Sequence, residues 1–135
     1  MADQTNFDEV FRRLKAILKP HEKKMVVAHD TPIMYALNTR HIMKNKQPLY
    51  FGGVRRGKAY VSFYLMSVYV SAEEVKGMSP ALRKKMQGKS CFNFKAVDED
   101  LFKELATLTK SGARRFNDEK FIDGLRKMQA AGRKQ

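Results

Sequence analysis

The stretch Gln47–Val70, QPLYFGGVRRGKAYVSFYLMSVYV, decides how this chain folds. Its apolar residues recur at every second position on both sides of the polar, Gly-containing break at 55–58, which is typical of a β-hairpin. Two strands alone are not stable in water, so they need further strands or covering helices. Because side chains alternate along a strand, we expect two sets on opposite sides of 60–65. The core-facing set is Val61, Phe63 and Leu65, and the opposite set is Tyr60, Ser62 and Tyr64.

The flanking segments supply those elements. Apolar residues spaced three and four apart predict an amphipathic helix over 6–19, and a second one over 99–116 begins after the N-cap residue Asp98. Shorter patterns predict strands at 25–28, 33–38 and 90–95, helical turns at 71–75 and 81–86, a loop or single helical turn at 40–46, and a further helix within 120–130.

This order predicts one α+β domain spanning 1–135, with a packed core of about 6–118. Since successive strands are joined by short turns, we expect a mainly antiparallel sheet of about five strands. The N- and C-terminal helices then pack on one face of that sheet. The other face is left open unless the short inserted helices cover it.

Charge is the strongest compositional feature, because 27 Lys and Arg stand against 14 Asp and Glu, a net charge of +13. Such a field favours anionic partners, namely nucleic acid, phosphorylated metabolites or acidic proteins. The alternative is a well-solvated basic surface, since the cations are spread along the chain. The single cysteine excludes an internal disulfide, and no apolar run reaches membrane-spanning length. We therefore expect a cytoplasmic protein without a membrane partner.

The sequence carries none of the common catalytic or phosphate-binding motifs, and Gly52-Gly53 fits a bulge or turn in a strand better than a phosphate loop. His29, Asp30 and His41 are weak candidates for a metal site, against ordinary turn and surface histidines. Cys91 is a candidate reactive thiolate if the neighbouring lysines lie close enough to lower its pKa, although no base accompanies it. We expect no enzymatic activity.

The best candidate site combines two strands. If 60–65 and 90–95 are neighbours, their polar side chains share the face away from the helices, with Arg55 or Arg56 and the basic run 83–89 near its edges. Hydroxyls, an amide and cations together suit a small anionic ligand or an acidic protein segment. The alternative is that the short helices cover the tyrosines as packing residues. The candidate ligand-binding residues are Arg55, Tyr60, Ser62, Tyr64, Lys89, Cys91, Asn93 and Lys95.

Two long segments, HIMKNKQPLYFGGVRRGKAYVSFYLMSVYV and SPALRKKMQGKSCFNFKAVDEDLFKELATLTKSG, resemble the bacterial YdhG-like family of uncharacterised domains. The opening FRRLKAILKP fits the same family, and MQGKSCFNF at 86–94 is the most specific piece. The resemblance implies a frataxin-like α/β sandwich, and some members are described as iron chaperones. Iron binding of that type relies on acidic residues of the first helix, which here offers Asp8 and Glu9 and then becomes basic.

The resulting functional expectation is a non-enzymatic binding protein that takes a small anionic ligand or an acidic partner on the open sheet face. Two alternatives remain. The first is a frataxin-like iron-delivery protein, which rests on the resemblance alone. The second is a basic nucleic-acid-binding module, because aromatic residues interleaved with Lys and Arg on a sheet can stack on bases.

Overall fold

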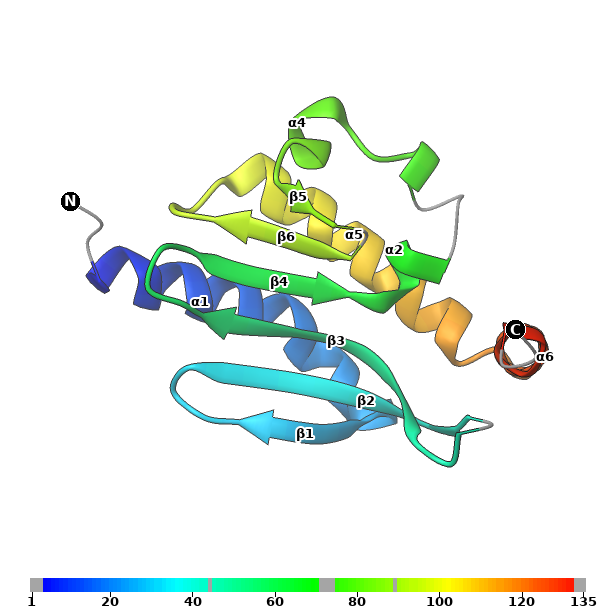
Figure 1. Cartoon of the computed structure of the whole chain (residues 1–135). Coiled ribbons are helices and arrows are strands. Elements are labelled where there is room, and N and C mark those ends of the chain that lie inside the picture. The colour runs from blue at the N-terminus through cyan, green and yellow to red at the C-terminus, as the bar shows by residue number, and fades with distance from the viewer. Residues whose placement is uncertain (1–3, 44, 71–74, 89, 133–135) are drawn as a thin grey trace.

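The computed structural model describes residues 4–43, 45–70, 75–88 and 90–132 (Figure 1). The elements follow one another as helix, strands with short helical insertions, and two C-terminal helices. They are α1 (Gln4–Leu18), η1 (Lys19–Lys24), β1 (Val26–Asp30), β2 (Met34–Ile42), β3 (Pro48–Arg56), β4 (Val61–Leu65), α2 (Met66–Val70), α4 (Pro80–Arg83), β5 (Met86–Gln87), β6 (Cys91–Phe94), α5 (Glu99–Phe116) and α6 (Glu119–Gly132).

The strands form one antiparallel sheet in the order β1-β2-β3-β4-β6-β5. The predicted α+β class and antiparallel sheet are therefore confirmed, with a sixth strand added. The additional strand is β5, which falls where the sequence predicted the end of a helix over 81–86. Helix α4 stops at Arg83, and Gly88 has a φ of 79°, a left-handed conformation that lets the chain reverse from β5 towards β6.

Helices α1 and α5 pack on the same face of the sheet, and the core lies between the two layers (Figure 1). The expected inward residues Phe63 and Phe92 are fully buried. Phe94 meets Phe102 of α5 edge to face, with ring centroids 5.1 Å apart, a favoured geometry for aromatic pairs. This apolar layer is what fixes the two helices against the strands.

Three boundaries differ from the predictions because tertiary contacts override local pattern. After Leu65 the chain does not continue as a strand to 70 but turns into α2, whose Val68 is buried in the core. The segment expected as a loop at 40–46 begins as strand, since β2 extends to Ile42 and pairs with Pro48. Helix α6 adds Ile122 and Leu125 to the core, which therefore extends past residue 118. The predicted turn at 71–75 lies outside the described residues apart from its last position.

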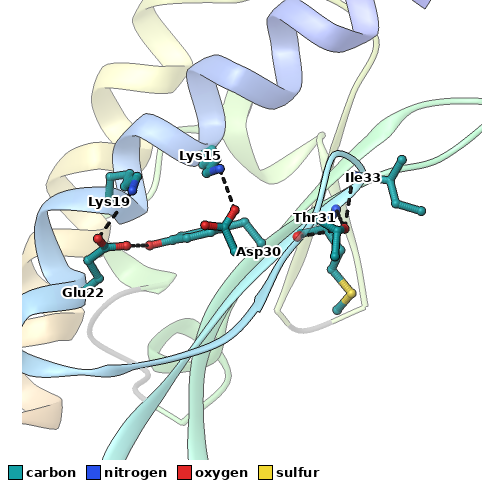
Figure 2. A network of polar contacts seen from close by, with 8 residues as sticks. Lys15, Lys19, Glu22, Asp30, Thr31 and Ile33 are labelled. Atoms are coloured by element: carbon teal, nitrogen blue, oxygen red, sulfur yellow. Dashed lines mark hydrogen bonds and ion pairs between the residues drawn. The ribbon is translucent and has the colours of Figure 1, made fainter.

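A polar network ties the end of α1 and η1 to the β1–β2 ribbon (Figure 2). Tyr35 of β2 lies under the helix layer and donates its hydroxyl hydrogen bond to Glu22, which also pairs with Lys19. Lys15 pairs with Asp30 at 2.8 Å and stands over the Tyr35 ring, with its Nζ 5.1 Å from the centroid. The buried tyrosine thus has both a hydrogen-bond partner and a cation–π partner.

Within the described residues, no helix combines the length and apolarity that crossing a bilayer requires.

Gly112 of α5 lies directly against Ser67 of α2. A Cβ at that position would lie 2.2 Å from the Oγ of Ser67 and 2.7 Å from its Cβ, so Gly112→Ala must push the two helices apart. We expect this substitution to reduce the free energy of unfolding by about 1–3 kcal/mol, the usual cost of overpacking. Urea unfolding measures the difference.

Gly124 of α6 supplies the matched control, because a Cβ there would meet no atom within 4 Å. Gly124→Ala should raise the free energy of unfolding by about 0.5–1 kcal/mol, since alanine is the better helix former. Equal effects of the two substitutions would contradict the close α2–α5 contact.

The pH dependence of stability in the variant Tyr35→Phe tests the polar network. The hydrogen bond from Tyr35, followed by the charge of Lys19, holds the pKa of Glu22 below its ordinary value of 4.5 in the folded protein. Stability from this interaction is therefore complete above pH 4.5 and is lost as pH falls through the lower folded pKa. The wild-type protein should exceed Tyr35→Phe in thermal stability at pH 6–7, and the difference should shrink as the pH falls below 4. A difference that grows in acid would contradict this arrangement.

Candidate functional site

The face of the sheet opposite α1 and α5, here called the open face, carries two rows of cross-strand neighbours (Figure 1). Tyr64 of β4 stands between Gly53 of β3 and Cys91 of β6. In the second row, Ser62 of β4 stands between Arg55 of β3 and Asn93 of β6. The register therefore brings together the two sets of polar residues that the alternation pattern placed on one face.

The short inserted helices do not pack across these rows in the described part of the chain. Helix α2 packs on α5 through Ser67, and the turn before α4 is held to α5 because Glu104 accepts hydrogen bonds from the backbone N–H and hydroxyl of Ser79 at 2.7 and 2.6 Å. Leu82 of α4 is fully buried in the core beside α5. The insertions thus cover the helix layer and one sheet edge.

Asn93 organises the centre of the open face. Its Oδ1 accepts a hydrogen bond from the Ser62 hydroxyl at 2.7 Å and from the Cys91 thiol at 3.4 Å. Its Nδ2 donates to Oε1 of Gln87 at 2.7 Å. One side chain therefore links β4, β6 and β5, which fixes the polar groups in position before any ligand arrives.

Tyr50 belongs to this face, although strict alternation along β3 places it with the core. The register shifts between the pairs Leu37–Gly52 and Asn38–Tyr50, so the chain bulges and Tyr50 turns to the open face. Its hydroxyl lies over Gly53, where a Cβ would stand 2.6 Å away. The Gly-Gly pair inside a strand is the sequence signal for this bulge. Burial, with Tyr64 and Cys91 nearby, raises the pKa of Tyr50 well above its usual value.

Two shallow hollows adjoin at Tyr60. The hairpin hollow, of about 320 Å³, contains Tyr60 with Arg55 and Lys58. The edge hollow, of about 580 Å³, contains Tyr60 with three lysines and the polar residues of β5 and β6. Ser62 and Tyr64 also line the hairpin hollow, and Lys84, Lys85, Gln87, Asn93 and Lys95 line the edge hollow.

Positive charge predominates in both hollows. Arg55, Lys58, Lys84, Lys85 and Lys95 are exposed, and none forms an ion pair with another described residue. The one carboxylate among the lining residues is Asp98, which is engaged at the N-terminus of α5 by accepting a hydrogen bond from the Leu101 N–H at 3.1 Å. Among the described residues, this surface therefore carries an excess of positive charge that no carboxylate compensates.

Seven of the eight candidate ligand-binding residues thus fall on or beside the open face. Lys89, the eighth, lies outside the described residues. Sequence reasoning missed Tyr50, Lys58 and Gln87 as site residues. Tyr50 was missed because of the bulge, and Gln87 because no strand was predicted between the helical turn at 81–86 and the strand at 90–95. Arg56, which the sequence did not separate from Arg55, points to the helix side and pairs with Asp8 at 3.1 Å.

Cys91 is not positioned as an activated thiolate. Burial raises the pKa of its thiol, and this effect outweighs the hydrogen bonds of Ser62 and Tyr64 that lower it. The conditional hypothesis of a reactive Cys91 thiolate is therefore not supported, because the thiol is half-buried and burial has the largest effect on its pKa.

The weak metal candidates are not brought together. His29 pairs in register with Ala36, whereas His41 lies five residues further along β2, roughly 16 Å away at strand spacing. Nε2 of His41 is hydrogen-bonded to the backbone carbonyl of Phe116 at 2.8 Å, and Asp30 is paired with Lys15. In the described ranges no group of three or more His, Cys, Asp or Glu could hold a metal ion.

The acidic residues of α1 do not fit an iron site of the frataxin type either. Asp8 is paired with Arg56, and Glu9 is paired with Arg12. Each carboxylate already neutralises a guanidinium, so this helix presents no free group of hard oxygen ligands.

No protein-family model, curated protein or solved structure matches the chain.

The raised thiol pKa predicts slow alkylation of Cys91. Because the thiolate is the nucleophile, iodoacetamide at pH 7.5 should modify the folded protein at least several-fold more slowly than the same chain unfolded in urea. Mass spectrometry of quenched time points gives both rates. A faster reaction in the folded state would show an activated thiolate and contradict the assignment.

Proposed function

We propose that this chain is a non-enzymatic binding protein whose open face takes a small anionic ligand or an acidic segment of a partner protein. One observation carries the proposal: five cations that form no ion pair with another described residue surround Tyr60 across two adjoining hollows. The one carboxylate among the residues that line these hollows, Asp98, already accepts a hydrogen bond at the start of α5.

The site has the features that anion recognition needs. Arg55 can form a bidentate pair with a carboxylate or phosphate, while the lysines act as point charges. The hydrogen bonds that hold Asn93 fix the floor of the edge hollow, which lowers the ordering cost of binding. A binding role without catalysis is favoured on this face because the Cys91 thiol is protonated at neutral pH by its raised pKa.

Single-stranded nucleic acid is the second candidate, and a specific feature favours it. Tyr60 and Tyr64 are half-buried, and Tyr60 separates the cations of the hairpin hollow from those of the edge hollow. Aromatic rings between cations suit bases stacked between phosphate contacts. No comparable feature favours iron.

Membership of the YdhG-like family also stays a proposal. Its most specific segment, 86–94, contains β5 and β6 and supplies Gln87, Cys91 and Asn93 to the open face. The part of the sequence that carries the resemblance therefore coincides with the candidate site.

A thermal-shift titration tests the anion site. Citrate, inorganic pyrophosphate and a nucleoside triphosphate are compared with sodium chloride at equal ionic strength. A ligand present at about 100 times its Kd stabilises the fold by roughly 2.7 kcal/mol, which raises the Tm by several degrees. If no member of this panel exceeds the chloride control, the small-anion proposal fails.

Two matched variants test whether the anion binds on the open face. Lys95→Ala should weaken binding of the best anion about tenfold, since one charge-assisted contact is worth roughly 1.4 kcal/mol. Lys127→Ala removes one exposed charge from α6 and should leave the Kd within twofold. Fluorescence anisotropy with a single-stranded oligonucleotide tests the nucleic-acid alternative. Tight binding that weakens strongly with salt, and that Tyr60→Ala abolishes, would favour nucleic acid over a small anion.

A further inference from the structure

A second concave surface lies on the helix layer and is not part of the open face. Its first half is a hollow of about 560 Å³ between α1 and α5. Small and apolar side chains dominate it, with Ala16 and Ile17 on α1 and Phe102 and Ala106 on α5. The small alanines keep the surface concave, so an elongated apolar group can lie between the two helices.

The second half is a hollow of about 380 Å³ between η1 and the C-terminal part of α5. Its rim carries the exposed cations Lys23, Lys24, Lys110 and Arg114, and the buried Met25 contributes to the floor. The two hollows share three lining residues, so they form one continuous surface. We call the joined hollows the helix trough; the shared residues are Pro20, His21 and Lys110.

Positive charge is concentrated in one half of the helix trough. In the apolar half, Arg13 donates a hydrogen bond of 3.0 Å to Glu99, so these two charges compensate each other. Lys103 also lines this half, and its charge acts on the same Glu99, so the positive excess here is smaller than in the cationic half. In the cationic half, none of the four cations forms an ion pair with any other described residue, and no carboxylate lines the hollow. An occupant that matches this pattern is apolar at one end and anionic at the other.

The dimensions agree with such an occupant. The lining residues of α5 run from Glu99 to Arg114, which is about 22 Å of helix at 1.5 Å per residue. The apolar part from Phe102 to Lys110 covers about 12 Å of that length. The cationic hollow follows directly, at the place where the head group of a single alkyl chain would lie.

We propose that the helix trough binds a single-chain amphiphilic anion of the fatty-acid class. The alkyl chain lies against Ala16, Phe102 and Ala106, and the carboxylate lies among Lys24, Lys110 and Arg114. A bilayer surface fits less well, because the large exposed apolar side chains among the described residues are elsewhere: Val26, Val27, Ile33, Ile42 and Tyr69.

Calorimetric titration with dodecanoate below its micellar concentration tests the proposal. Dodecanoate should bind several-fold more tightly than decanoate, because each buried methylene adds affinity. Acetate, which has only the head group, and dodecyltrimethylammonium, which has the opposite charge, should not bind measurably. In NMR spectra, dodecanoate should shift the His21 ring signals. Equal affinity for dodecanoate and acetate would overturn the proposal.

Variants separate the helix trough from general attraction to a basic protein. The double variant Lys110→Ala with Arg114→Ala should weaken dodecanoate binding at least tenfold. The matched control, Lys120→Ala with Lys127→Ala, removes two exposed cations from α6, outside both concave surfaces, and should change the affinity less than twofold. Equal losses in both double variants would show non-specific charge attraction and overturn the proposal.

A third variant tests the apolar half alone. Ala106→Gln changes no charge, and glutamine is a good helix former, so the variant should fold. Its longer polar side chain should occupy the apolar half and weaken dodecanoate binding several-fold. Unchanged affinity in this variant would overturn the placement of the alkyl chain. Binding to phosphatidylglycerol vesicles without binding to monomeric dodecanoate would likewise overturn the proposal and identify a membrane-surface contact instead.

Discussion

The structure depends on the burial of a single apolar sheet face beneath two helices. Phe63 and Phe92 are fully buried at the centre of that layer, and the aromatic contacts Phe94–Phe102 and Phe51–Phe116 join the strands to α5. Each aromatic residue removes a large apolar area from water, which is the dominant favourable term in folding. The other face, which lacks a matching apolar set, is left to polar side chains.

That asymmetry explains why the open face is both polar and ordered. Ser62 is buried although it lies on the face without helices, because neighbouring side chains and the Asn93 network surround it. The cations lie exposed at the rim. A hydrogen-bonded polar floor with an exposed basic rim is an arrangement that suits recognition of anions, since the floor supplies geometry and the rim supplies attraction.

The two concave regions divide the excess positive charge between the two sides of the molecule. On the open face, cations surround tyrosines and an amide; on the helix layer, they lie at one end of an apolar surface. A net charge of +13 alone does not distinguish these environments. The class of anion that each surface suits follows from the uncharged neighbours, which are tyrosine rings, a hydroxyl and amides in one case and Ala, Ile and Phe side chains in the other.

The sequence by itself determined the fold class, the two long helices and the alternation that puts Ser62 with Tyr64, and Cys91 with Asn93, on one side of each strand. That these two strands are neighbours was decided by the fold. Local periodicity of two or 3.6 residues is a property of the chain, so it can be read without coordinates. Only the tertiary structure decided the bulge that turns Tyr50 outward, the strand β5, and the raised pKa of Cys91. Those features depend on strand register, helix-to-helix approach and burial, which arise from contacts between residues distant in the chain.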